Sequence, residues 1–274
     1  KNSFFNALPI NCLLSIKLLS FVASKLHNIM KTIIKKKQAF SDQDNLILFC
    51  DKKSKLSSFD LSKSELKFIK KQWNDKKEIV AINQYPRLIF IVKPKERKDI
   101  NNHFEYLRLL GDQLQASLKN ETSVMIIDVK GNQKELLAIT EGMALANYTF
   151  TKHKTDPKAH KLKSIYLEKI INTKDVKELQ NIVDAVYFTR DLINEPFSHL
   201  TAKDLAEAAV KSGKINGFKT TVFNKKKIES LKMGGLLAVN KGSIDDPTFT
   251  IMEWKPKNAK NKQPIILIGK GIVY

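Results

Sequence analysis

Apolar residues occur along this chain in two kinds of run: short blocks that are apolar throughout, and longer stretches with an apolar residue every three or four positions. A short block such as NLILFC (45–50) predicts a strand covered on both faces, as in a parallel sheet. A longer stretch such as 97–119 predicts an amphipathic helix. From about residue 44 the two kinds of run alternate, which predicts an α/β layered fold.

The first predicted domain spans residues 30–172. Its strands are expected at 45–50, 78–83, 87–92 and 123–129, and its helices at 62–73, 97–119 and 133–148; the segment 162–170 closes the domain. Ser62 is a suitable N-cap for the first of these helices, because its hydroxyl can accept a bond from an unpaired backbone N–H.

A linker helix is predicted within residues 173–195, since Pro196 disfavours the helical conformation in Glu195. A second α/β domain is predicted at 196–274. Its helices are expected at 202–212, with Thr201 as N-cap, and at 225–233; its strands are expected at 218–223, 234–240, 248–254 and 264–269. The last strand contains the run Ile265–Ile268, which is apolar throughout and reads as buried on both faces.

Residues 1–29 precede the first methionine, Met30, and are an unassigned leader or upstream extension. The apolar stretch 12–24 is similar to part of a secretory signal, but Lys17 interrupts it and it is too short to cross a bilayer. A leader, a translation artefact and a short amphipathic helix are all compatible with this composition. We favour an artefact or a dispensable extension.

The chain has 274 residues and a formal net charge of +20, carried by 48 lysines and arginines against 28 acidic residues. Only four of the basic residues are arginines: Arg87, Arg97, Arg108 and Arg190. Lysine is a strongly hydrated point charge, whereas arginine is suited to bidentate phosphate and guanine contacts. The charge therefore favours a solvated lysine-rich surface, with loose and salt-sensitive nucleic-acid binding at most.

Two cysteines, Cys12 and Cys50, form neither a disulfide framework nor a zinc knuckle, and they indicate free thiols in a reducing compartment. The five histidines show no metal-ligand spacing. A glycine-rich segment beginning at Gly235 fails as a phosphate loop, because Asn240 replaces the second glycine and Gly242 replaces the serine or threonine.

Three ordered motifs carry a family resemblance. The first is R-D-L-x-N-x-P at 190–196, the second is M-G-x-x-L-A-V-x-x-G-S at 233–243, and the third is a strand that ends in G-K-G at 269–271. In this order the motifs resemble the M17 leucyl (cytosol) aminopeptidase family. The resemblance runs from about residue 186 to the end of the chain; before that, it rests on an α/β domain similar to a macro domain.

The resemblance implies that Lys270 is a ligand of a site with two divalent metal ions, manganese or zinc. It also implies that a bridging aspartate would follow Tyr274 directly, and that the catalytic lysine and arginine would lie farther on. No catalytic residue is then present, and the chain is expected to be a truncated and inactive part of the enzyme. Lysine can bind a metal only as a neutral amine, so carboxylates must hold the metal first.

Other polar residues near the motifs have structural interpretations. Arg190 and Asp191 are expected to organise the domain junction, and Asn194 and Glu195 to form turns and caps. His199 is expected to be packed or solvent-facing. The paired carboxylates Asp245 and Asp246 are expected in a solvated turn.

The family implies hydrolysis of N-terminal residues, with leucine-type side chains favoured, by a cytoplasmic homo-hexamer acting on peptides. Two alternatives remain open at this point. One is a macro-like module that binds nucleic acid or an ADP-ribose-type ligand. The other is a non-enzymatic remnant that persists as an assembly or regulatory partner.

Overall fold

The computed structural model of the protein describes residues 31–261 and 263–271, so the unassigned leader or upstream extension at 1–29 lies outside the described residues. The chain divides into two compact units, and the division falls between Asp184 and Ala185. This point lies inside the predicted linker helix. The predicted domain bounds at 30–172, 173–195 and 196–274 stay predictions.

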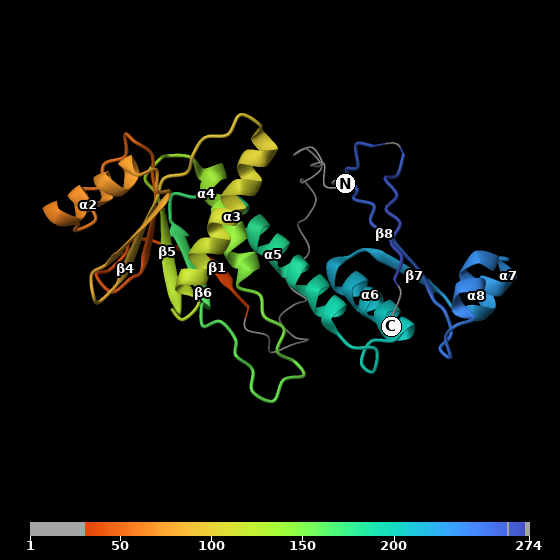
Figure 1. Ribbon diagram of the computed structural model, residues 1–274. Coiled ribbons are helices and arrows are strands. Elements are labelled where there is room, and N and C mark those ends of the chain that lie inside the picture. Colours follow the sequence, from red (N-terminus) through yellow and green to blue (C-terminus); the bar gives the residue numbers. More distant parts are fainter. Residues whose placement is uncertain (1–30, 262, 272–274) are drawn as a thin grey trace. The chain divides into compact units, whose positions relative to one another are not determined.

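The N-terminal unit is built on a six-stranded sheet in the order β1-β6-β5-β2-β4-β3 (Figure 1). Its strands are β1 (Ile33–Lys37), β2 (Leu46–Phe49), β3 (Ile79–Asn83), β4 (Leu88–Val92), β5 (Ser123–Asp128) and β6 (Ser164–Glu168). All neighbouring pairs are parallel except β3 with β4. The predicted α/β fold class is confirmed.

Helices cover both faces of this sheet (Figure 1). They are α2 (Lys63–Asn74), α3 (Ile100–Leu118), α4 (Gln133–Ala146) and the first part of α5 (Thr173–Asn194). Ile69 of α2 packs against Leu46 and Leu48 of β2, in one layer of the core. Because side chains alternate across a strand, Ile47 and Phe49 point to the opposite face, where α3 and α4 lie. All four side chains of β2 are fully buried, as the apolar run predicts.

Ser62 caps α2 as predicted. Its hydroxyl accepts a bond from the backbone N–H of Glu65 at 3.2 Å, while the Glu65 carboxylate accepts one from the Ser62 N–H at 2.6 Å. This reciprocal arrangement is a capping box, which satisfies two backbone donors at the helix start.

Strand β1 was not predicted, because three consecutive lysines, Lys35–Lys37, hide its apolar pattern. It is an edge strand paired with β6 alone, and only Ile34 is buried. The lysine ammonium groups reach polar partners: Lys36 donates to Thr173 Oγ1 at 2.8 Å, and Lys37 lies 2.6 Å from Asp44 Oδ2. An edge position tolerates charged side chains that a central strand would exclude.

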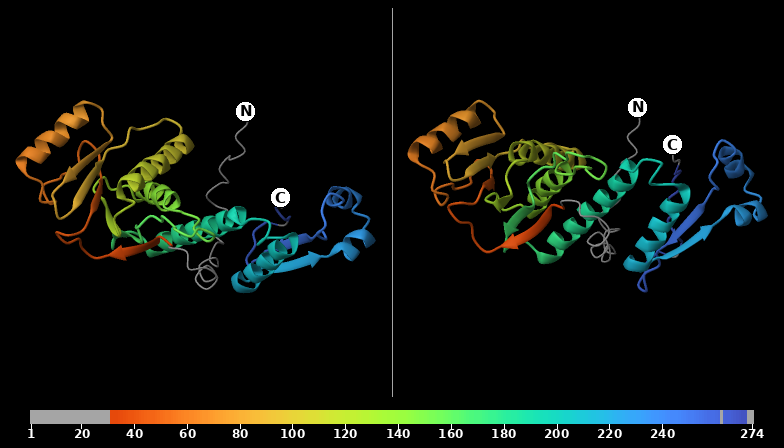
Figure 2. Two further views of the ribbon diagram at one scale, coloured as in Figure 1. Left: turned by 60° about the horizontal axis from the view of Figure 1, so that its bottom comes forward. Right: turned by 90° about the horizontal axis from the view of Figure 1, so that it is seen from below.

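The C-terminal unit contains α6 (Ala202–Asn216), β7 (Lys219–Phe223), α7 (Lys225–Ser230), α8 (Gly234–Asn240) and β8 (Phe249–Glu253). Strands β7 and β8 form an antiparallel pair, with α6 packed along it (Figure 2). On the face that carries Phe223 and Phe249, the two rings stack with centroids 6.0 Å apart. Ile251 on the same face is 42% exposed.

Two predicted strands of this unit are wrong. Residues 234–240 form the helix α8, and Ile265–Ile268 form no regular element. A strand needs a neighbour to accept its backbone hydrogen bonds, and the described residues provide none for either segment. A leucine- and alanine-containing segment can instead satisfy its own bonds as a helix. Ile265–Ile268 are 66–95% exposed rather than buried.

None of the helices within the described residues is both long enough and apolar enough to span a membrane.

Asp184 of α5 provides a test of electrostatics in the N-terminal unit. The residue is 8% exposed, and burial raises the pKa of its carboxyl group, although Lys31 and the bond from Gln180 Nε2 at 3.0 Å oppose the shift. Because the pKa of Asp184 is higher in the folded than in the unfolded protein, proton binding by this carboxyl group stabilises the fold. That stabilisation is present below the unfolded pKa and is lost as the pH rises through the folded pKa. We therefore expect Asp184→Asn to raise the Tm at neutral pH and to change it little at acid pH, in circular dichroism melts.

The control is Asp156→Asn, which makes the same charge change at an exposed loop position. A Tm gain for Asp184→Asn that persists unchanged below the unfolded pKa of an aspartate would contradict the electrostatic explanation.

Candidate active-site segment

The R-D-L-x-N-x-P motif forms the end of α5 and the turn that follows it. The Asn194 side-chain amide donates to the Arg190 carbonyl at 2.8 Å, and the Glu195 N–H donates to the Asp191 carbonyl at 3.1 Å. The Pro196 carbonyl then accepts bonds from two N–H groups of the turn, those of His199 and Leu200. Asn194 is the last residue of α5 and its side chain caps a carbonyl of the final turn, as its predicted capping role requires, and the motif ends one helix and redirects the chain.

Helix α6 begins at the predicted cap. The Thr201 hydroxyl accepts from the Asp204 N–H at 3.4 Å, and the Asp204 carboxylate accepts from the Thr201 N–H at 2.8 Å and from its hydroxyl at 2.6 Å. The bond from the Thr201 hydroxyl is the main reason why the pKa of Asp204 is lowered. His199 is exposed, and its Nδ1 lies 2.9 Å from Ser198 Oγ. Thr201 and Asp204, the two residues of the capping box, therefore have a structural role.

The second motif forms α8 and the turn after it. A Cβ on Gly234 or Gly235 would meet no atom within 4 Å, so these glycines are not required by close packing. After the helix, Asn240 Nδ2 donates to the Asp245 carbonyl at 2.8 Å, and Asp246 Oδ1 lies 3.2 Å from Lys225 Nζ. The two carboxylates thus lie in a surface turn, as predicted.

The G-K-G segment passes beside α6. A Cβ on Gly271 would come within 3.2 Å of Leu205 Cδ2, whereas Gly269 has open space around it. Lys270 between them is exposed. The described residues of this segment form no regular element, so the predicted strand before Lys270 is absent from them.

The described residues do not by themselves fit a two-metal centre. Within 31–261 and 263–271, no three histidine, cysteine, aspartate or glutamate side chains lie close enough together to hold a metal ion. A single lysine amine offers little affinity without carboxylates that hold the metal first. Lys270 as a metal ligand therefore stays a prediction.

The N-terminal unit contains the predicted macro-like domain, for which an ADP-ribose-type ligand was one alternative. In an open parallel sheet, ligands bind beyond the carboxyl ends of the strands at the topological switch point, here between β2 and β5. The loop after β5 has Gly131 at φ 81°, but Asp128 Oδ1 already accepts from the N–H groups of Gly131 and Asn132 at 2.8 and 3.0 Å. The Asp128 carboxylate thus already satisfies two backbone donors of this loop, which are not free to bind an anion.

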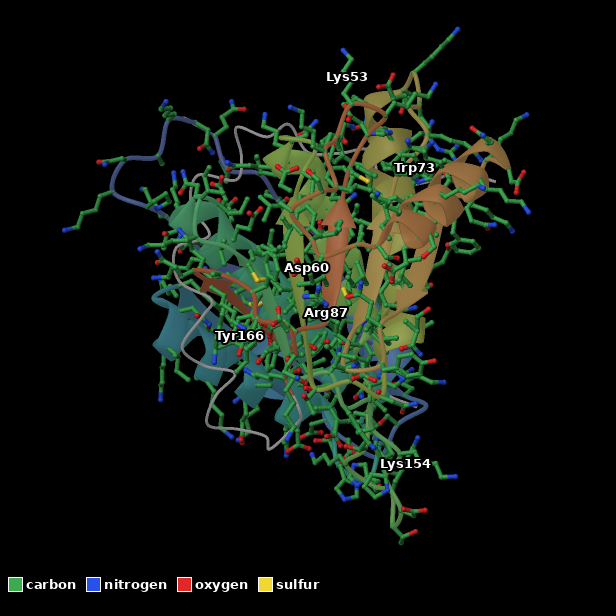
Figure 3. All side chains as sticks on the ribbon, turned by 90° about the vertical axis from the view of Figure 1, so that its left-hand side faces the viewer. Lys53, Asp60, Trp73, Arg87, Lys154 and Tyr166 are labelled. Carbon is green, nitrogen blue, oxygen red and sulfur yellow. The ribbon has the colours of Figure 1, made fainter. Side chains whose placement is uncertain are left out.

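An open polar hollow of about 740 Å³ lies at the amino end of β4 and was not predicted. Its inner wall includes Arg87, which is 4% exposed; Nε donates to Gln84 Oε1 at 2.9 Å and an Nη lies 3.7 Å from Asp60 Oδ2. Figure 3 shows Asp60 and Arg87 next to each other. Asp60 and Tyr85, both at the rim, have positive φ values of 53° and 65°. No sequence signal marks these two backbone conformations, since neither residue is glycine.

Comparisons with known proteins agree with the motifs. The family model for the catalytic domain of the cytosol aminopeptidase family, Peptidase_M17, matches residues 187–274. A probable cytosol aminopeptidase from Chlorobaculum parvum is 61% identical over 85 residues, which cover 31% of this chain and 17% of that protein. Another from Sulfurihydrogenibium sp. is 33% identical over 193 residues, or 66% of this chain and 37% of that protein. The matches therefore span about a fifth to two fifths of the length of these relatives.

Solved structures show the same fold at low sequence identity. A tomato leucine aminopeptidase mutant matches with a TM-score of 0.60 and 17% identity, covering 79% of this chain and 49% of that one. The bottromycin maturation enzyme BotP in complex with Mn matches with a TM-score of 0.61 and 16% identity, covering 78% and 46% of the two chains. The motifs and the family model lead to one conclusion: residues 187–274 of this chain match the catalytic domain of the M17 cytosol aminopeptidase family.

Proposed function

We propose that this chain is part of a leucyl-type aminopeptidase, which removes N-terminal residues from peptides with two divalent metal ions, manganese or zinc. The observation that carries the proposal is the match of residues 187–274 to the catalytic-domain model of the family. A related structure was determined with Mn, which supports the choice of metal class. A cytoplasmic homo-hexamer is part of the same proposal, as is an arrangement of macro-like domain, linker helix and catalytic domain at 30–172, 173–195 and 196–274.

Lys270 is the residue of this chain that we assign to the metal site. It lies between two glycines, so the backbone on both sides can approach a bound group without steric hindrance. When bound, the two metal ions would supply an activated water and polarise the scissile carbonyl. The part of this chain in that chemistry is limited to offering one amine, because the described residues contain no carboxylate cluster to hold the ions.

The 274-residue chain on its own is expected to release no leucine from leucine p-nitroanilide in the presence of Mn²⁺ or Zn²⁺. Measurable release that is abolished by a chelator would contradict this expectation. Because lack of activity alone would not test the assignment of Lys270, a chimera is needed. In it, the remaining catalytic domain of the Chlorobaculum parvum relative follows residue 274 of this chain.

We expect the chimera to be active and Lys270→Met to lower its metal affinity by at least about 10- to 100-fold, because a direct ligand should matter no less than the groups that orient ligands. Metal bound per subunit, measured by elemental analysis after dialysis, gives a readout independent of turnover. Lys260→Met replaces another exposed lysine of the same unit and should leave metal content unchanged. Equal metal content in the two variants would overturn the assignment of Lys270.

A further inference from the structure

Nine exposed lysines gather on one part of the N-terminal unit, which we call the lysine face. They come from the loop after β2, from α2 and from the residues just after α2: Lys52, Lys53, Lys55, Lys63, Lys67, Lys70, Lys71, Lys76 and Lys77. Among the described residues, no carboxylate lies within ion-pair distance of any of their ammonium groups. The lysine face is therefore a positively charged surface without internal neutralisation.

The acidic residues of the same stretch are few and mostly engaged elsewhere. Residues 51–77 carry the nine lysines against four carboxylates, a net charge of +5. Asp51 accepts bonds from Ser54 Oγ and the Lys53 N–H at 2.9 and 2.8 Å, and Glu65 belongs to the capping box of α2. Asp60 lies at the polar hollow beside Arg87. The carboxylates thus serve the local fold, and the lysines remain directed to solvent.

The loop and the helix form one continuous surface, because Lys93 joins them. Lys93 Nζ lies 4.4 Å from the ring centroid of Trp73, in the last turn of α2. Burial lowers the pKa of Lys93, and the charge of Lys52 in the loop lowers it further. Two ammonium groups from different elements are therefore close enough to repel each other. A bound polyanion would relieve this repulsion.

The surface is unsuited to insertion into a membrane. An interfacial helix buries an apolar face in the lipid, but the apolar residues of α2 already pack on the sheet: Ile69 is 1% exposed, and Leu66 and Trp73 lie against the same core layer. Phe68, at 45% exposure, is the one large apolar side chain that α2 presents to solvent among its described residues. A single aromatic ring also provides no stacking platform for successive unpaired bases.

The chemistry of the lysine face fits double-stranded nucleic acid that is bound through its phosphate groups. Lysine ammonium groups bind phosphate as point charges and lack the planar fork that recognises guanine. Lys63, Lys67 and Lys70 fall on one stripe of α2, so they can contact one run of phosphates together. Lysine donors can also reach a 2′-hydroxyl, but the phosphates that both duplexes share carry the charge that attracts the lysine face.

We propose that the lysine face binds the phosphate backbone of duplex DNA without reading base sequence. This binding is separate from the aminopeptidase proposal, because it uses the N-terminal unit alone. Its strength comes from counterion release, so it weakens steeply with salt.

The test compares two triple charge reversals in the 274-residue chain by fluorescence anisotropy with a labelled duplex of about 20 base pairs. The first is Lys63→Glu/Lys67→Glu/Lys70→Glu on the lysine face. The second is Lys154→Glu/Lys158→Glu/Lys161→Glu, which changes the net charge equally. Lys53, which belongs to the lysine face, and Lys154 lie at opposite ends of the N-terminal unit (Figure 3). Circular dichroism checks that both variants are folded.

We expect the lysine-face variant to lose at least about tenfold in affinity and about three units of the salt slope, at roughly 0.9 per phosphate contact, while the control stays within about twofold. Equal losses in both variants would mean that net charge alone attracts the DNA, and would overturn the proposal. Unchanged binding by the lysine-face variant would do the same. Tighter binding to duplex RNA, to an acidic polypeptide or to vesicles containing phosphatidylserine would overturn the choice of DNA.

Discussion

Gly142→Ala is expected to destabilise the N-terminal unit by about 3 kcal/mol, a large effect for one added methyl group. The added Cβ would lie 2.0 Å from the Arg108 carbonyl oxygen and 2.6 Å from two other backbone atoms of Arg108. Backbone atoms cannot move aside as the end of a side chain can, so α3 and α4 would have to separate. A Cβ added to Gly111 on α3 would overlap the carbonyl oxygen of Ile139 on α4 in the same way. The two helices thus touch through glycines on both sides.

The matched control is Gly235→Ala, which makes the same chemical change in α8. Nothing lies within 4 Å of the added Cβ there, and alanine is favoured over glycine in a helix by up to about 1 kcal/mol. Urea unfolding followed by far-UV circular dichroism should show a lower midpoint for Gly142→Ala and an equal or higher midpoint for Gly235→Ala. A neutral Gly142→Ala would show that α3 and α4 do not pack this closely.

Ile266→Ser/Ile268→Ser is expected to lower the aggregated fraction of the chain by at least about twofold, because contiguous exposed apolar residues promote association. The four residues Ile265–Ile268 are 66, 74, 88 and 95% exposed, and no strand among the described residues pairs with them. They have the composition of a buried strand but none of its contacts. Light scattering at 37 °C and the fluorescence of an apolar dye should both decrease in the double variant.

Val239→Ser/Ile244→Ser is the control for this second prediction. These side chains are 62 and 99% exposed, but Leu236 and Leu237 in the same helix as Val239 are half-buried, and Ile244 lies between two polar residues. Scattered exposed apolar residues are common on protein surfaces and contribute little to association. Equal improvement in both double variants would indicate that total exposed apolar area, rather than the Ile265–Ile268 segment, controls aggregation.

Local sequence patterns were sufficient for most strands of the N-terminal unit and for its helices. The run Leu46–Phe49 is apolar at every position, and only burial on both faces makes such a run favourable, so its assignment to a buried strand needed no further information. The caps Ser62 and Thr201 were predictable because each forms its bonds within three residues. The three family motifs are likewise local patterns, so the family is recognisable from the order and spacing of their residues alone.

Contacts between distant residues decided the rest. Residues 234–240 and 265–268 read as strands, yet a strand exists only where a neighbour accepts its hydrogen bonds, and the described chain gives them none. Lys35–Lys37 read as polar, yet β6 pairs with them as part of an edge strand. The amino-acid sequence alone therefore predicts the kind of most elements and the family resemblance, because both depend on nearby residues. The pairing of the strands and the shared face of loop and helix lysines follow from the three-dimensional fold alone, because they depend on where the chain brings separate elements together.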